Sequence, residues 1–173
     1  SGKSLFISFI IIELLKIKAD ITIADIKKSD LSSLSAFLGT DKVASSSTSI
    51  AKVVRLAVEE MRSRYDFINA PENFKYGSNF SDHGFNQKWL LFDEIGAFSG
   101  SATDKKSKEI VTEVMDGIKQ LILLGRQAGV FILIAGQQVS ASNLSTELRD
   151  NLGLRIALGA NSQEGYRMVF GSA

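Results

Sequence analysis

Short apolar segments alternate with long amphipathic ones along this chain of 173 residues, and the alternation restricts the folds that it can adopt. The short segments are apolar and rich in β-branched or aromatic residues, which favours buried strands at 19–26, 89–92, 130–135 and 153–159. The long segments place apolar residues at helical spacing and charges on the other faces, which favours helices at 47–69 and 105–126. Strands that alternate with helices predict an α/β fold, with a mostly parallel sheet and helices on both faces.

The most apolar stretch of the chain, LFISFIIIELL at 5–15, is too short to cross a membrane. A membrane-spanning helix needs about 20 apolar residues, and this stretch is closed by Glu13, Lys16 and Lys18. No small-residue cleavage site follows it, which argues against a signal peptide. We therefore predict a buried helix at these residues.

Two carboxylates stand at the end of a predicted strand, because residues 89–92 run apolar straight into Asp93 and Glu94. Burying carboxylates is costly unless a cation or strong hydrogen bonds compensate. An exposed acidic turn after an ordinary strand would show the same residues. In a phosphate-loop enzyme Mg²⁺ and the attacking water provide the compensation, with Asp93 near the ion and Glu94 polarising the water.

The first four residues, Ser1, Gly2, Lys3 and Ser4, match the last four positions of the phosphate-binding loop G-x-x-x-x-G-K-[ST]. The helix expected at 5–15 would start directly from them, with free N–H groups and its positive dipole end facing a phosphate. The strand at 130–135 leads to Gln137, whose amide could contact the γ-phosphate or the attacking water, or simply mark the passage from strand to loop. Ligands of parallel sheets bind at the carboxyl ends of the strands. The convergence of these groups predicts a P-loop ATPase that uses ATP and Mg²⁺.

Composition narrows the remaining classes of function. Twenty Lys and Arg against 19 Asp and Glu leave a net charge of +1, so any surface that binds nucleic acid must be local. The chain has no Cys and only His83, which excludes a disulfide framework, a thiolate metal site and a histidine cluster, and it favours a cytoplasmic protein.

Three segments resemble the motor domain of FtsK/SpoIIIE-type DNA translocases: LLFDEIGAF at 90–98, GRQAGVFILIAGQQ at 125–138 and LRDNLGLRIALGANSQEGYRMVFG at 148–171. The likeness is closest to the TcpA-like coupling proteins of conjugative elements in Gram-positive bacteria, which share the DHGF and STELRDNLGLRI character of 82–85 and 145–156. The resemblance implies a RecA-like P-loop fold and one motor domain over 1–173.

The resemblance also implies roles for single residues. Lys3 would hold the β- and γ-phosphates, Ser4 would ligate Mg²⁺, and Asp93 and Glu94 would act as described above. Gln137 matches the glutamine that senses the γ-phosphate, although Gly136 stands where the family usually has threonine.

Two arginines match family positions as well. Arg126 matches a turn arginine that in relatives reaches the nucleotide of a neighbouring subunit, although a cation at the end of a helix is also favoured by the helix dipole. Arg155 matches the arginine of an Asn-x-x-x-Arg-Ile segment, with a structural or interfacial role.

By the same resemblance, the motor would work as a hexameric ring around double-stranded DNA and contact its phosphate backbone. The lysines at 105, 106 and 108 are candidates for that contact, or a solvated charge run, and Lys27 and Lys28 could face nucleotide, DNA or water. The family further implies a cytoplasmic motor of a membrane-associated protein, joined to transfer or division machinery through regions outside this chain.

Two other functions remain open. Related ATPases of type VII secretion move proteins, and a degenerate domain could serve only in assembly, although Lys3, Asp93 and Glu94 are all intact. The glycines and the strand that should precede Ser1 are absent from the sequence. We therefore expect a fragment that begins inside the phosphate loop, lacks the first strand of the sheet and binds ATP poorly by itself.

Overall fold

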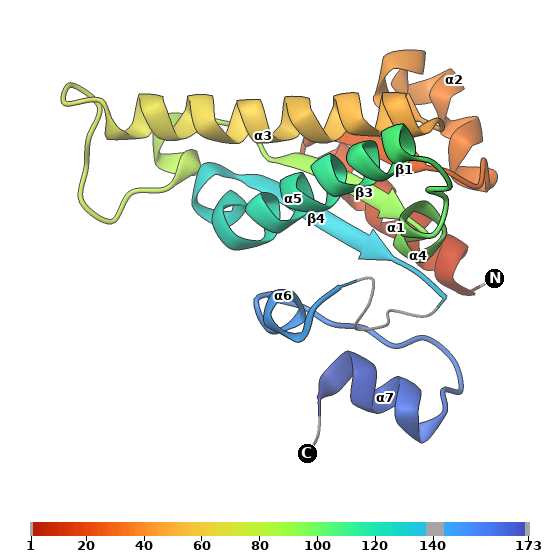
Figure 1. The fold of residues 1–173 in the computed structure, drawn as a ribbon. Coiled ribbons are helices and arrows are strands. Elements are labelled where there is room, and N and C mark those ends of the chain that lie inside the picture. Colours follow the sequence, from red (N-terminus) through yellow and green to blue (C-terminus); the bar gives the residue numbers. More distant parts are fainter. Residues whose placement is uncertain (1, 138–143, 172–173) are drawn as a thin grey trace.

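The computed structural model describes residues 2–137 and 144–171, and a four-stranded parallel sheet lies at its centre (Figure 1). The strands are β1 (Asp20–Asp25), β2 (Val43–Ala44), β3 (Lys88–Asp93) and β4 (Val130–Ala135), in the order β2-β1-β3-β4. Asp25 pairs in register with Asp93, and Asp93 with Ala135. The carboxyl ends of β1, β3 and β4 therefore lie level with one another, at one edge of the sheet.

Helices cover both faces of this sheet, as the sequence predicts. One face packs against α1 (Gly2–Lys16), through Ile7, Ile11 and Leu14. The other face packs against α3 (Ser47–Asn69) and α5 (Lys105–Ala128), which lie side by side. At Gly117 a Cβ atom would lie only 2.5 Å from Val54 Cγ1, so the absence of a side chain allows α3 and α5 to approach closely.

The two long helices have well-defined ends. Ser46 and Ser49 form a capping box at the start of α3, and Asp104 and Ser107 form one at the start of α5. α5 is capped by Gly129, whose φ of 70° is left-handed. A Cβ atom at this position would clash with the Phe80 ring. The turn brings the chain directly into β4.

Short elements connect these parts. The link from β1 to β2 contains η1 (Asp30–Leu34), α2 (Ser35–Leu38) and η2 (Thr40–Lys42). Further along the chain lie η3 (Phe80–His83), α4 (Ile95–Ser99), α6 (Thr146–Asp150) and α7 (Gln163–Phe170). Figure 1 shows α6 and α7 apart from the sheet, below the end of β4.

Two expectations from the sequence need correction, and one strand was not expected. Residues 153–159 form no strand: Leu154, Ile156 and Leu158 are exposed, and no described strand pairs with this segment. β2 was not anticipated, because two residues are too few for a visible pattern. The helix at 5–15 is buried on one face only, since Leu5 and Phe9 are 75% and 58% exposed.

The prediction that residues 5–15 do not cross a membrane agrees with the structure. None of the described helices combines the length and the apolar character that a bilayer span requires.

Candidate active site

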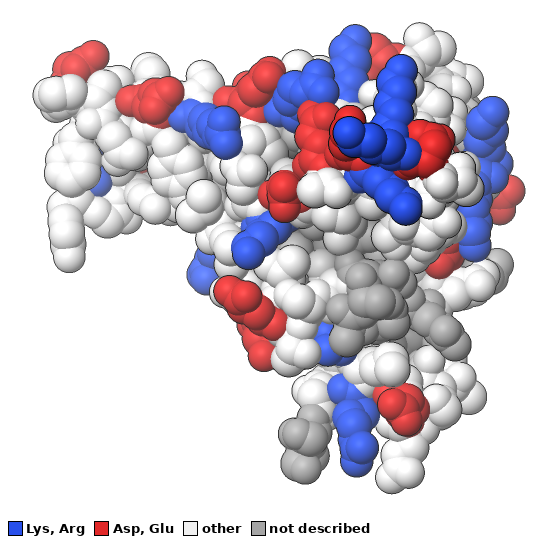
Figure 2. Space-filling model, in the orientation of Figure 1, with Lys and Arg blue, Asp and Glu red and all other residues white. Residues whose placement is uncertain are grey.

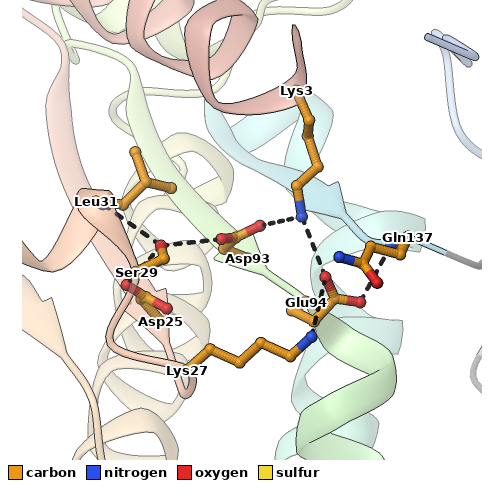
Figure 3. Close-up of polar contacts among 8 residues, drawn as sticks. All are labelled: Lys3, Asp25, Lys27, Ser29, Leu31, Asp93, Glu94 and Gln137. Carbon is orange, nitrogen blue, oxygen red and sulfur yellow. Dashed lines mark hydrogen bonds and ion pairs between the residues drawn. The ribbon is translucent and has the colours of Figure 1, made fainter. Parts of the chain in front are cut away.

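Four of the sequence-predicted residues meet at the carboxyl edge of the sheet. Asp93 ends β3, Glu94 follows it, and Gln137 lies two residues beyond β4. Lys3, in the first turn of α1, reaches across from the neighbouring layer. Figure 3 shows their side chains directed toward one another.

Lys3 joins the two acids. Its Nζ donates to Asp93 Oδ1 at 2.9 Å and to Glu94 Oε2 at 3.1 Å. The side chains of Asp93 and Glu94 are only 9% and 8% exposed. Burial opposes the charged form of Lys3, but its hydrogen bonds and charge interactions with Asp93 and Glu94 outweigh burial and raise the pKa of Lys3 above its ordinary value.

Glu94 adopts a backbone conformation that few side chains tolerate. Its φ of 61° and ψ of 57° are left-handed, and it stands at the N-cap of α4. The Glu94 N–H donates to Ala135 O at 2.9 Å, which ties this conformation to the end of β4. Such strain costs roughly 1–3 kcal/mol and clusters at functional sites, so its place beside Lys3 supports an active-site role.

The Glu94 carboxylate is held from three sides. Oε1 accepts the backbone N–H of Gln137 at 3.1 Å, and Oε2 lies near Lys3 and, at 3.6 Å, near Lys27 Nζ. Burial alone would raise the pKa of Glu94, but the Gln137 N–H and the two lysines lower it below its ordinary value. Glu94 is therefore ionised at neutral pH, as a residue that polarises water must be.

The site also contains Asp25 and Ser29, which the sequence pattern did not single out. Asp25 ends β1 and is fully buried; its Oδ2 accepts from Ser29 Oγ at 2.9 Å and from Ser32 Oγ at 2.7 Å. Ser29 Oγ also lies 3.3 Å from Asp93 Oδ2, so it bridges the ends of β1 and β3. Asp25 ends its strand as Asp93 does, and that parallel could have drawn attention to it.

The other predicted residues lie elsewhere or at the margin of this cluster. Gly2 and Ser4 flank Lys3 on the first turn of α1, and Ser1 lies outside the described residues. Arg126 lies in the last turn of α5, before β4 begins, so this chain's own site is at the opposite edge of the sheet. Arg155 donates to Asp150 Oδ1 at 3.4 Å and to Val169 O at 3.2 Å, which links α6 to α7.

The chemistry of this edge fits Mg²⁺. Three acids (Asp25, Asp93 and Glu94) face two lysines (Lys3 and Lys27), and Asp25 Oδ1 is buried without a hydrogen-bond partner among the described residues. Oxygen ligands suit Mg²⁺, which usually keeps several waters and takes one or two protein carboxylates together with phosphate oxygens. Within 2–137 and 144–171, no group of three acidic or histidine side chains is arranged to hold a metal ion by itself. A Mg²⁺ ion bound together with phosphate oxygens and waters does not require such a group.

Comparison with known proteins supports the family resemblance. No family model matches the chain. The FtsK domain-containing protein YdcQ of Bacillus subtilis (strain 168) is 35% identical over 170 residues, which covers 98% of this chain and 34% of YdcQ. The chain is thus similar to an FtsK domain-containing protein. It spans about a third of that relative's length.

Two solved structures show the same fold. The conjugation coupling protein TcpA of pCW3, a monomer form with ATPγS, matches 98% of this chain and 49% of its own, with a TM-score of 0.80 and 18% identity. The cytoplasmic domain of the type VII secretion ATPase EccC of Thermomonospora curvata matches 88% of this chain and 18% of its own, with a TM-score of 0.56 and 18% identity. The α/β fold expected from the sequence, with a mostly parallel sheet and helices on both faces, is thereby confirmed.

Proposed function

We propose that this FtsK-type chain is the motor of an ATP-driven translocase that moves double-stranded DNA, in conjugative transfer. The observation that carries the ATPase part is the joint contact of Lys3 with Asp93 and Glu94, at 2.9 and 3.1 Å, at the carboxyl edge of the sheet. A lysine in the first turn of α1 and two acids at the end of β3, of which Glu94 has a left-handed backbone, suit phosphoryl transfer to water.

In this proposal Lys3 leaves the two acids when ATP binds and turns to the β- and γ-phosphates. Ser4 and Asp93 would hold Mg²⁺, which would supply positive charge to neutralise the phosphate oxygens. Glu94, ionised and fixed by the Gln137 N–H, accepts a hydrogen bond from the attacking water and orients it toward the γ-phosphate. The Gln137 side chain is exposed beside it and free to contact the same phosphate.

Arg126 would act on the nucleotide of another subunit. It is exposed at the edge of the sheet opposite its own Glu94, so it would need a neighbouring copy to reach a nucleotide. That separation favours a ring of subunits, for which we propose six by analogy with FtsK-type motors.

The DNA cargo rests on the resemblance and on one structural relative, the conjugation coupling protein TcpA. On the face drawn in Figure 2, acidic and basic side chains are interspersed, so contact with the phosphate backbone would use a narrow set of lysines. The candidates at the start of α5 are Lys105, Lys106 and Lys108. The likeness to the type VII secretion ATPase EccC makes protein translocation the second candidate.

The deciding experiment is ATP hydrolysis by the full-length protein, with and without double-stranded DNA, beside its Glu94→Ala variant. We expect hydrolysis that duplex DNA stimulates and that Glu94→Ala abolishes. Glu59→Ala is the matched control, because Glu59 is exposed on α3 away from the site. Turnover indifferent to DNA would favour protein translocation, and no turnover under any condition would favour an assembly module.

A further inference from the structure

Lys27 is a cation that the ATPase scheme above leaves without a function. It follows β1, on the turn that leads to η1, and its side chain is 48% exposed. Its Nζ lies 3.6 Å from Glu94 Oε2, the same oxygen that accepts from Lys3. Figure 3 shows the Lys27 side chain extended from its turn toward Glu94.

We propose that Lys27 is a positioning residue, which takes over as the cationic partner of Glu94 when Lys3 turns to the phosphates of bound ATP. This inference rests on the proposed ATPase function. It assigns to Lys27 an effect on turnover through Glu94, with no direct contact to the nucleotide.

The first argument is that Lys3 cannot serve both purposes. Its ammonium group has three donors, and in this structure two of them are used on Asp93 and Glu94. Reaching two phosphate groups would withdraw donors from the acids. Glu94, whose side chain is only 8% exposed, would then lose the nearer of its two lysine contacts.

The second argument is that Lys27 can stay when Lys3 leaves. Lys3 belongs to the first turn of α1, whereas Lys27 belongs to the turn after β1, on a different element. Among the described residues, these two are the lysines within 4 Å of the Glu94 carboxylate. A small change in the half-exposed Lys27 side chain would close its 3.6 Å contact into a hydrogen bond.

The third argument is that the turn carrying Lys27 is anchored to the same edge of the sheet. The Lys28 N–H donates to Asp25 O at 3.3 Å, and Lys28 is left-handed with φ of 52°. Ser29 Oγ, two residues after Lys27, lies within hydrogen-bond distance of both Asp25 Oδ2 and Asp93 Oδ2. The backbone of Lys27 is thus held between two fixed points, which suits a residue that positions another.

The test compares three variants of the full-length protein. Lys27→Gln removes the charge, Lys27→Arg keeps it, and Lys119→Gln removes the charge of an exposed lysine on α5, for which the described structure shows no ion pair. We expect Lys27→Gln to lower kcat about 10-fold, with ATP affinity within about twofold of wild type. Lys27→Arg should recover most of kcat, and Lys119→Gln should match wild type.

A further readout separates positioning from a purely structural role. In a Glu94→Gln background, adding Lys27→Gln should lower the residual rate no further, because Lys27 acts through Glu94.

Each other outcome overturns a defined part of the proposal. Full kcat in Lys27→Gln, with hydrolysis in wild type, would overturn the role of Lys27 alone. A large loss of ATP affinity with unchanged kcat would show that Lys27 binds phosphate and would overturn positioning. Absence of hydrolysis in wild type would overturn the proposed function, and this role with it.

Discussion

The amino and carboxyl edges of the sheet, where the parallel strands begin and end, differ in the balance between acids and lysines. At the amino edge, Asp20 begins β1 and accepts from Lys42 Nζ at 2.6 Å and from Lys88 Nζ at 2.7 Å, while 41% of its side chain stays exposed. At the carboxyl edge, Asp93 and Glu94 are nearly buried and share Lys3. One acid has two lysines at the first edge, whereas acids outnumber lysines at the second.

The buried guanidinium of Arg64 at the amino edge has hydrogen-bond and charged partners. Arg64 of α3 is 7% exposed, donates to Asn86 O at 2.8 Å and Ala128 O at 3.0 Å, and pairs with Glu60 at 2.8 Å. Its guanidinium also lies 5.1 Å from the centre of the Phe85 ring. The carboxyl edge, by contrast, contains an Asp25 oxygen with no hydrogen-bond partner within 2–137 and 144–171, and a strained Glu94. Paired charges at the amino edge stabilise the fold, whereas an unsatisfied oxygen and backbone strain at the carboxyl edge support the proposed ligand site there.

The largest expected effect comes from Asp93→Asn, which changes charge at the carboxyl edge. We expect ATP turnover to fall by about 10²-fold or more, because the neutral amide is a poor partner for Mg²⁺. Stability should stay the same or rise slightly, since the amide oxygen can still accept from Lys3 and one of the crowded negative charges is gone. Urea denaturation beside an ATPase assay measures both. A stability loss above about 2 kcal/mol would contradict this account of the edge, because it would place Asp93 among the stabilising pairs.

Arg64→Met is the reciprocal change at the amino edge. We expect it to lower the free energy of unfolding by about 2–4 kcal/mol, because charged hydrogen bonds are lost and buried carbonyls are left unpaired. ATP turnover per folded molecule should not change. Arg62→Met is the control: Arg62 donates to Gln120 Oε1 at an exposed site, and its loss should cost less than about 0.5 kcal/mol. Equal costs for the two arginines would contradict the comparison.

The carboxyl edge could be located from the sequence because only local information was needed. Apolar runs that end in Asp93 and Gln137 identify strand ends, and the ends of parallel strands share an edge. The pairing of Asp25 with Asp93 depends on strand register, which no local pattern specifies. The left-handed Glu94 and the position of Lys27 likewise depend on neighbouring elements, so they could not be predicted.

The failed strand at 153–159 has a related cause. Apolar alternation shows what a segment could bury, but a strand also needs a partner with free backbone groups. Here Arg155 ties the segment to Asp150 and Val169 instead, and its apolar residues remain exposed. The long helices were predicted well because their caps and periodicity lie within the helices themselves.

The smallest expected effect separates the edges by pH. Burial opposes ionisation of Asp20, but the hydrogen bonds and charges of Lys42 and Lys88 outweigh it and lower the pKa of Asp20. A carboxyl with a lowered folded-state pKa stabilises the fold above its unfolded pKa of about 3.9, and that stabilisation is lost as pH falls through the folded value. Because these pairs are exposed, Asp20→Asn should cost only about 0.5–1 kcal/mol at pH 7.

The unfolding free energies of wild type and Asp20→Asn should therefore differ at pH 7 and converge as the pH falls well below about 3.9, where Asp20 is protonated in both states. Urea titrations across this range measure the convergence, and Asp41→Asn serves as the exposed control, since no ion pair of Asp41 is seen in the described structure. A gap that persists unchanged at low pH would mean that Asp20 acts through packing. The ion pairs of Asp20 would then contribute nothing to the free energy of unfolding. In that case charge would matter only at the carboxyl edge, for the proposed ATP turnover.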